Sequence, residues 1–388
     1  MNTRNVVIVT LFMIAVAAVV TVAILLQPQK NLATVPIANS ETVANTATTG
    51  QFPPATPLSQ DIGPGLTASL GPTLVGHLAG LAEGGVGAYA HYVYATINHQ
   101  AYVIDVSNPA LPTPVALFDG GSMFNDIAIV GSYAYVTRGG LLFSGQGLQT
   151  KLDMYSLADP RNPKKVGEYT DTSEDAVGYN NIYINNGHAF VTDGFSTVYI
   201  FDVSHPQHPT KISTTTLQQK AGGAAGMAGL GNYLYIADGD NGFAVLDVAD
   251  PNKVKLIQLV DTVGSPKSVA VAGAILYVAD IQGYGMMAYD VRAPSAPRLI
   301  AQQYAQHDVF GSHDGRNFVV TTATRVIGVS SNGLTSFDIN KPGSLTALTN
   351  IGLDGESSSP SYGVTILGKY LYVTEYTTGL LVYNISQV

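Results

Sequence analysis

The chain alternates apolar and polar residues over short runs that recur at a nearly constant spacing. Seven times, an apolar run ends in a small polar residue and is followed by a turn. These terminal residues are Asp105, Ser156, Asp202, Asp247, Asp290, Asp338 and Asn384, which lie 43 to 51 residues apart. Period-two alternation within short runs that are separated by Gly and Pro turns predicts β-strands.

A second kind of run, a tight turn followed by an aromatic-rich strand, precedes each of these. Its copies are residues 90–96, 131–137, 186–192, 231–237, 273–279, 315–321 and 368–374. Four strands in a unit of about 40–50 residues is the spacing of a propeller blade, and seven such units make a closed ring. We therefore predict an all-β, seven-bladed β-propeller over residues 71–388.

The two ends of this region predict how the ring closes. The seventh copy stops at Val388, after its third strand, whereas residues 71–80 (GPTLVGHLAG) resemble the fourth-strand segment 162–171 (NPKKVGEYTD). Pairing of residues 72–79 with 379–385 would complete the last blade and remove two exposed sheet edges. A leucine-rich solenoid, the structural alternative, needs shorter repeats and leaves its ends open.

The recurrent polar position at the end of each third run has a local explanation. An Asp or Asn side chain before a turn accepts backbone N–H bonds and stabilises the turn. We therefore interpret Asp105, Asp202, Asp247, Asp290 and Asp338 as turn residues rather than as functional sites.

Three repeat phrases resemble the LVIVD-repeat family of prokaryotic extracytoplasmic β-propellers. They are YVIDVSNPALP (102–112), YIADGDNGFAVLDVADP (235–251) and YVADIQGYGMMAYDVRAP (277–294). The resemblance covers about residues 71–388 and departs most in the second blade, which has an insertion at 139–149 and Ser156 in place of Asp. It implies a surface or periplasmic setting and a binding role, and it carries no catalytic signature.

The N-terminal segment predicts that the chain is targeted to a membrane. Residues 6–26 form a run of 21 uncharged, mainly apolar residues, which as a helix would span about 31 Å. Because Arg4 precedes the run, the N-terminus stays in the cytoplasm and the rest is exported. We predict a cytoplasmic n-region (1–5), a transmembrane signal-anchor (6–26) and a flexible Thr/Ala/Pro-rich stalk (27–70). A cleaved signal peptide, which would leave a secreted propeller, is the alternative.

Charge and cysteine content exclude several classes of function. The net charge is −9 and there is no basic cluster, which argues against nucleic-acid binding. The chain has no cysteine. Disulfides, thiolate nucleophiles, Cys-ligated zinc and a lipid-anchored Cys are therefore excluded.

Aligning the turn glycines places a set of polar residues where the innermost strands begin, at one mouth of the central channel. These ligand-binding candidates are Asn125, Asp126, Asn180, Asn181, Lys267, Ser268, His307, Asp308 and Tyr362. Converging polar groups in a concave site predict a ligand site. The alternative is a water-filled channel whose polar groups satisfy the backbone.

No metal or cofactor site is predicted. The pairs His307–Asp308 and His313–Asp314 are expected at opposite ends of one strand, about 20 Å apart, which is too far for a shared metal. The segment DGDNG (238–242) lacks the acidic fifth and twelfth positions of a calcium loop. The acidic loop 171–175 is interpreted as solvated, with calcium as the alternative.

Two functions from different classes remain open. The first is a non-catalytic binding or scaffold module, which presents its channel face to an extracellular or periplasmic protein, peptide or glycan. The second is an extracytoplasmic hydrolase or metal-dependent enzyme with its site around Asp126, Lys267, His307 and Asp308. Propellers host both functions, so the fold does not choose between them.

Overall fold

The computed structural model describes residues 72–140, 148–173, 178–217, 223, 225–262, 264–280, 285–303, 318–330, 333–345, 347–351 and 361–386. The predicted segments 1–5, 6–26 and 27–70 lie outside this set. Within it, no helix has the length and apolar character needed to cross a bilayer.

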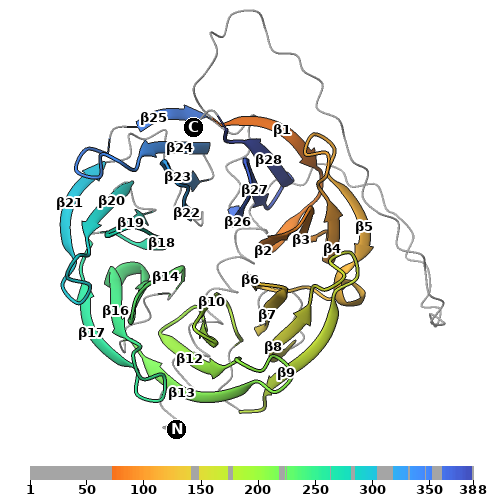
Figure 1. The fold of residues 1–388 in the computed structure, drawn as a ribbon, viewed down its shortest axis with the longest axis horizontal. Coiled ribbons are helices and arrows are strands. Elements are labelled where there is room, and N and C mark those ends of the chain that lie inside the picture. Colours follow the sequence, from red (N-terminus) through yellow and green to blue (C-terminus); the bar gives the residue numbers. More distant parts are fainter. Residues whose placement is uncertain are drawn as a thin grey trace, which may run out of the picture. The chain divides into compact units, whose positions relative to one another are not determined.

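Seven four-stranded antiparallel sheets, the blades, stand around a central axis (Figure 1). This arrangement confirms the predicted all-β, seven-bladed propeller. The innermost strands are β2 (Ala82–Tyr89), β6 (Asp126–Val130), β10 (Ile182–Asn185), β14 (Met227–Leu230), β18 (Pro266–Ala272), β22 (Phe318–Thr321) and β26 (Ser361–Leu367). The second strands are β3 (Tyr92–Ile97), β7 (Tyr133–Gly140), β11 (His188–Thr192), β15 (Tyr233–Ala237), β19 (Ile275–Asp280), β23 (Arg325–Ser330) and β27 (Tyr370–Glu375).

The two outer positions of each blade follow the same order. The third strands are β4 (Gln100–Asp105), β8 (Leu148–Ser156), β12 (Thr197–Asp202), β16 (Phe243–Asp247), β20 (Met286–Asp290), β24 (Gly333–Asp338) and β28 (Gly379–Asn384). The fourth strands are β5 (Thr113–Leu117), β9 (Lys164–Asp171), β13 (Thr210–Thr216), β17 (Lys255–Val260), β21 (Arg298–Gln303), β25 (Ala347–Ile351) and β1 (Thr73–Leu78). Two short 3-10 turns, η1 (Phe118–Gly121) and η2 (Gly239–Asn241), complete the described elements.

One strand assignment in the sixth blade was wrong. Residues 315–321 were predicted as the aromatic-rich strand directly before the run that ends in Asp338, which is the second strand of a blade. Instead, Phe318–Thr321 form β22, the innermost strand, and Arg325–Ser330 form the second strand β23. The reason lies in the residues: RVIGVS (325–330) has no aromatic side chain. The aromatic signature of a second strand therefore pointed to the neighbouring strand.

The seventh blade is built from both ends of the described region. Strand β1 pairs antiparallel with β28, with Thr73 opposite Asn384 and Leu78 opposite Leu380. Gly76 in β1 packs against the proline turn of the next blade, because a Cβ there would lie 1.9 Å from the carbonyl oxygen of Pro109. In β9 a Cβ on Gly167 would lie 2.0 Å from the carbonyl oxygen of the corresponding proline, Pro206. This shared contact explains why a glycine stands at the same place in 71–80 and in 162–171.

The residue at the end of each third strand fixes the turn that follows it. In all seven blades its side-chain oxygen accepts the backbone N–H of the residue two positions on, over 2.8–3.3 Å. This confirms the interpretation of the recurrent acidic position as a turn residue. Ser156 performs the same role in the second blade with its hydroxyl.

The core is divided among the gaps between blades. The described residues form seven clusters of buried apolar side chains, and each one joins two neighbouring blades. Strand β3 shows how: Val93, Ala95 and Ile97 face the seventh blade, whereas Tyr92 and Tyr94 face the second. Because successive side chains of a strand point to opposite faces, one strand serves two gaps.

The close approach at Gly76 leads to a first prediction. We expect Gly76→Val to lower the free energy of unfolding by about 1–3 kcal/mol, because the added side chain overpacks the contact with Pro109. Urea unfolding of the full-length protein measures this. Thr73→Val, at an exposed position of the same strand, is the matched control and should change stability little. Equal midpoints for the two variants would contradict the contact.

Candidate functional site

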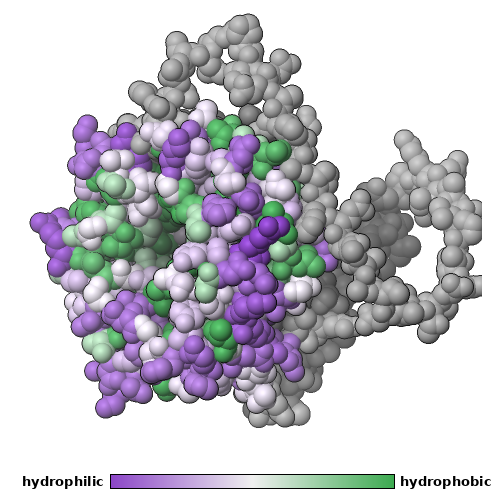
Figure 2. Space-filling view, turned by 45° about the vertical axis from the view of Figure 1, so that its right-hand side comes forward, coloured by the Kyte–Doolittle hydropathy of each residue, from purple (hydrophilic) through white to green (hydrophobic). Residues whose placement is uncertain are grey.

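All seven innermost strands contribute to a cavity of about 190 Å³ on the central axis. In the space-filling view the surface is hollowed where hydrophobic residues gather, while hydrophilic residues spread over the outer surface (Figure 2). The cavity lining comprises Val86, Asp126, Ile127, Asn181, Ile182, Gly226, Met227, Ser268, Val269, Phe318, Val319, Val320, Tyr362, Gly363 and Val364. Of the predicted ligand-binding residues, this cavity is lined by Asp126, Asn181, Ser268 and Tyr362.

Several of the predicted ligand-binding residues bind neighbouring blades together. The Asp126 carboxylate accepts the backbone N–H of Ile127 over 2.8 Å and that of Ile182, in the third blade, over 3.1 Å. The Ser268 hydroxyl accepts the backbone N–H of Val319, in the sixth blade, over 3.2 Å. These groups satisfy buried backbone donors, as backbone in a packed interior requires.

Asn125 and Tyr362 also make contacts within the fold. The Asn125 amide donates to the carbonyl oxygens of Gly139 and Tyr179 over 2.8 and 2.6 Å. The Tyr362 ring lies 5.9 Å from that of Tyr376, centroid to centroid. Both side chains therefore stabilise the fold at the mouth of the channel through these contacts.

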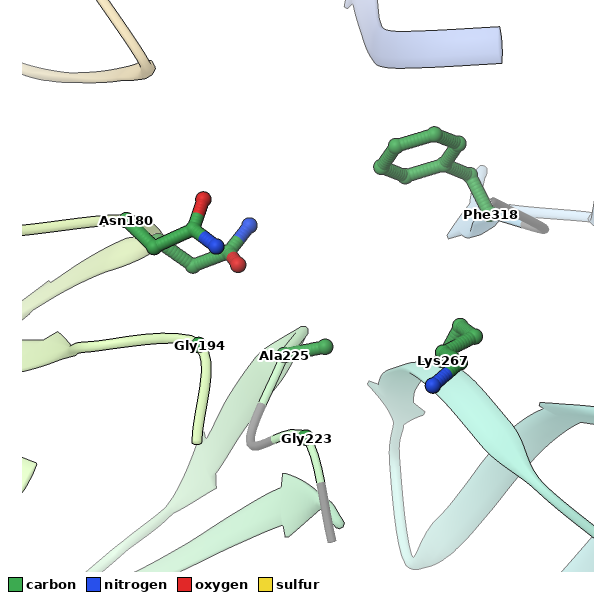
Figure 3. A pocket seen from close by; sticks show the side chains of 7 residues that line it. Asn180, Gly194, Gly223, Ala225, Lys267 and Phe318 are labelled. Carbon is green, nitrogen blue, oxygen red and sulfur yellow. The ribbon is translucent and has the colours of Figure 1, made fainter. Parts of the chain in front are cut away.

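A smaller cavity of about 150 Å³ lies beside the axis, where the third to sixth blades meet. Its lining residues are Asn180, Asn181, Gly194, Gly223, Ala225, Lys267 and Phe318. Figure 3 shows two amide side chains on one side of this space, the Phe318 ring opposite them and Lys267 below the ring. We call this space the mouth pocket. It combines two amides, one ammonium and one aromatic ring from three separate blades.

The two asparagines are held by their backbones, which leaves their side chains to the pocket. The Asn180 N–H donates to Thr192 O over 2.7 Å, and Asn180 O accepts the Thr137 hydroxyl over 2.6 Å. Asn181 O accepts the Thr192 N–H over 3.0 Å. Among the described residues, neither asparagine side chain has a hydrogen-bond partner. Two half-buried amides are thus available to a ligand.

Lys267 owes its position to a β-bulge. The register between β18 and β19 shifts between Pro266 and Ser268, so Lys267 is the extra residue of the bulge. Bulges re-aim side chains and are common beside functional sites. Its Nζ lies 3.4 Å from where a Cβ on Gly223 would stand, so the glycine makes room for the ammonium.

Phe318 occupies the place in the sixth blade that the sequence alignment assigned to His307 and Asp308. Those two residues lie outside the described part of the chain, and so do His313 and Asp314. Phe318 was missed because residues 315–321 were read as a second strand. A second ring stands nearby: Phe195 is 53% exposed, follows Gly194 of the pocket, and accepts the Gly223 N–H with its carbonyl oxygen over 3.0 Å.

Four carboxyl groups occupy equivalent buried positions around the same mouth. Asp280 and Glu375 end their second strands, and Asp193 and Asp238 directly follow theirs; all four are at most 9% exposed. Sequence reasoning did not single out this set, although the repeated phrases VTD, IAD, VAD and VTE carry the signal. Asp193 accepts two backbone N–H groups of its hairpin, at Phe195 and Thr197.

Burial makes two of these carboxyls weak acids. It raises the pKa of Glu375 to about 7. It also raises the pKa of Asp238 to about 6, against an opposing hydrogen bond from Asn241 and the positive charge of Lys267. Within the described residues, Glu375 Oε1 and Asp238 Oδ1 have no hydrogen-bond partner, so desolvation of the charged form dominates.

The described residues contain no group of three or more His, Asp or Glu side chains placed to hold a metal ion. Asp171, from the acidic loop weighed for calcium, is bound instead by Lys211, Tyr179 and Ser173 over 2.6–3.0 Å. These contacts hold the pKa of its carboxyl well below the usual range. Glu174 and Asp175 lie outside the described residues.

Comparison with known proteins agrees with the repeat pattern. The LVIVD repeat matches four segments, 84–119, 121–142, 221–262 and 263–303, as the resemblance in the sequence predicted. A search of curated proteins finds no match.

Solved structures show the same fold at low sequence identity. Virginiamycin B lyase from Staphylococcus aureus has a TM-score of 0.56 at 11% identity, over 78% of this chain and 94% of that one. A chain of the Mitotic Checkpoint Complex has a TM-score of 0.55 at 14% identity, over 92% and 99%. The computationally designed Ika8 protein has a TM-score of 0.53 at 9% identity, over 77% and 82%. At these identities the likeness concerns the fold alone.

The raised pKa of Glu375 predicts a pH-dependent stability. A folded-state pKa of about 7 against an ordinary value of 4.5 means that the protonated form stabilises the fold below about pH 4.5. This contribution is lost as the pH rises through 7. We expect Glu375→Gln to unfold less readily than wild type at pH 8, by about 2–3 kcal/mol, and to match it near pH 4.

Urea unfolding between pH 4 and 8 measures this difference. Asp247→Asn is the matched control, because it makes the same charge change while an amide keeps the turn bond, as Asn384 does in the seventh blade. Parallel stability curves for wild type and Glu375→Gln would refute a buried neutral carboxyl.

Proposed function

From the premise that this chain carries LVIVD repeats on a seven-bladed β-propeller, we propose that it is a non-catalytic binding module outside the cytoplasm. Residues 6–26 anchor it in the membrane, and the mouth pocket receives its ligand, a group on a protein, peptide or glycan. The observation that carries this proposal is the convergence of Asn180, Asn181, Lys267 and Phe318 in one cavity.

The chemistry of the pocket supports recognition. Side-chain amides offer both hydrogen-bond donors and acceptors, and an ammonium offers three donors with a charge. A few polar groups beside an apolar ring are typical of a small ligand site. The carboxylate assigned to an enzyme, Asp126, already accepts two backbone N–H groups. These two bonds give Asp126 a role in joining the second and third blades, which favours a binding role for the mouth over acid–base chemistry at this carboxylate.

The position of the pocket also supports this role. It lies on the face that carries the hairpins between second and third strands and the connections between blades. The opposite face carries the seven regular turns that end the third strands. Functional residues concentrate on variable connections held by a rigid scaffold. One face of the propeller therefore carries the same structural turn in every blade, whereas the hairpins and connections on the pocket face differ from blade to blade.

Export can be tested with a fusion reporter. We expect alkaline phosphatase fused after Val388 to be active in bacterial cells that express the full chain, because the enzyme needs an oxidising compartment to form its disulfides. Removal of residues 1–26 should abolish the activity, since the uncharged segment directs export. An inactive full-length fusion that is present at normal abundance would contradict the extracytoplasmic setting.

Binding can be tested by screening the detergent-purified full-length protein against peptide and glycan arrays. We expect Asn181→Ala and Phe318→Ala to weaken any specific ligand at least about tenfold, because each removes a pocket contact. Leu299→Ala, at an exposed position of the outer strand β21, is the control and should bind as wild type. Circular dichroism checks that each variant folds. Specific binding that survives both pocket substitutions would place the site elsewhere.

A further inference from the structure

The mouth pocket is sized for one unit of a larger ligand. Its volume of about 150 Å³ is close to that of a cavity that holds a single benzene ring. It is well below the roughly 300–1,000 Å³ of sites that enclose a whole drug-sized molecule. A ligand therefore inserts one ring-sized group, while the rest of it lies across the face of the propeller.

The hydrogen-bonding groups of the pocket match a sugar ring. Asn180 and Asn181 each present an acceptor oxygen and a donor NH₂. A hydroxyl is also both donor and acceptor, so adjacent hydroxyls of a pyranose can satisfy both amides. A peptide carboxyl terminus offers acceptors only, apart from its backbone N–H groups. The two adjacent asparagines therefore favour a polyhydroxyl ring over a peptide end.

The aromatic ring and the ammonium add an apolar face and a charge. Phe318 faces the amides across the pocket (Figure 3), where it can pack against the C–H face of a sugar. Lys267 stands on its bulge at the side of the same space. Among the residues that line the pocket it carries the charge, and a charge-assisted bond to a carboxylate is stronger than one to a neutral hydroxyl.

We infer that the mouth pocket binds one uronic acid residue of an acidic extracellular glycan, with the sugar carboxylate at Lys267, its hydroxyls at Asn180 and Asn181, and its ring face on Phe318. The inference rests on the proposed binding function and names its ligand class. Phe195, exposed directly beyond Gly194, provides the next surface for a neighbouring sugar unit. Since glycans repeat, two aromatic surfaces in succession suit a chain better than a single free sugar.

The test uses the full-length protein with oligosaccharides of glucuronic, galacturonic and mannuronic acid and with their carboxyl-reduced counterparts. Each pair shares a backbone and differs only in the carboxylate. Isothermal calorimetry should show at least one acidic oligomer binding about tenfold or more tightly than its reduced form. Lys267→Met should bring that ratio close to one. Lys255→Met, an exposed lysine of the outer strand β17, makes the same charge change and should leave the ratio intact.

A further variant tests the extended ligand. Phe195→Ala should weaken an acidic tetrasaccharide several-fold and leave a methyl uronide monosaccharide unchanged, since the monosaccharide fills only the pocket. Equal binding of the acidic and reduced oligomers, or an acid preference that persists in Lys267→Met, would overturn the inference. Absence of binding by all the acidic oligomers would overturn it as well.

The two proposals fail in different ways. If no uronate binds but an array peptide does, and Asn181→Ala abolishes that binding, the proposed binding function is supported and the uronic acid ligand is refuted. If neither arrays nor oligouronates bind the folded full-length protein, both proposals fall. A purely structural role for Lys267 would lower the melting temperature of Lys267→Met without changing the preference for acidic over reduced sugar, and this too would overturn the inference.

Discussion

No blade of this propeller can bury its own apolar side chains. The middle strands carry apolar residues on both faces, and each face is covered only by the neighbouring blade, as strand β3 shows with Val93 and Ala95 on one side and Tyr94 on the other. Stability therefore comes from successive interfaces rather than from one central core, as in other repeat proteins. The pairing of β1 with β28 matters for the same reason, because it supplies the last blade with its fourth strand.

This packing also decides what the central mouth can do. The inner strands converge there, and their first residues carry backbone groups that must be satisfied between blades. Asp126 and Ser268 meet that need by bridging to Ile182 and Val319. Asn180 and Asn181 make their hydrogen bonds to the fold with backbone atoms alone. Their side chains line the mouth pocket instead of bridging two blades, and this difference separates the mouth pocket from the rest of the ring.

The two faces of the propeller differ in how their carboxyl groups are hydrogen-bonded. Glu375 and Asp238 keep a pKa of about 7 and about 6 because burial disfavours their charged forms. On the opposite face, the carboxylates that end the third strands accept backbone N–H bonds, and the pKa values of Asp105 and Asp202 are lowered. Proteins commonly depart from local consistency where they function. The position of the mouth pocket on the less satisfied face fits that pattern.

The fold could be predicted from the sequence because its signals are local. Period-two runs, the aromatic second strands and the polar residue before each turn act over a few residues, so their repetition predicted seven blades, the turn role of Asp105 and its counterparts, and the spare strand at 72–79. The same local signals misassigned β22, because RVIGVS lacks the expected aromatic ring.

The candidate site could not be predicted in the same way, because it depends on contacts between blades. Only the tertiary structure showed that Asn125 and Asp126 form hydrogen bonds within the fold. It also showed that a bulge places Lys267 at the cavity. Phe318 lines the same cavity as two asparagines more than a hundred residues away in the chain. Packing between distant segments leaves no periodic trace in the chain, so spacing alone could not reveal it.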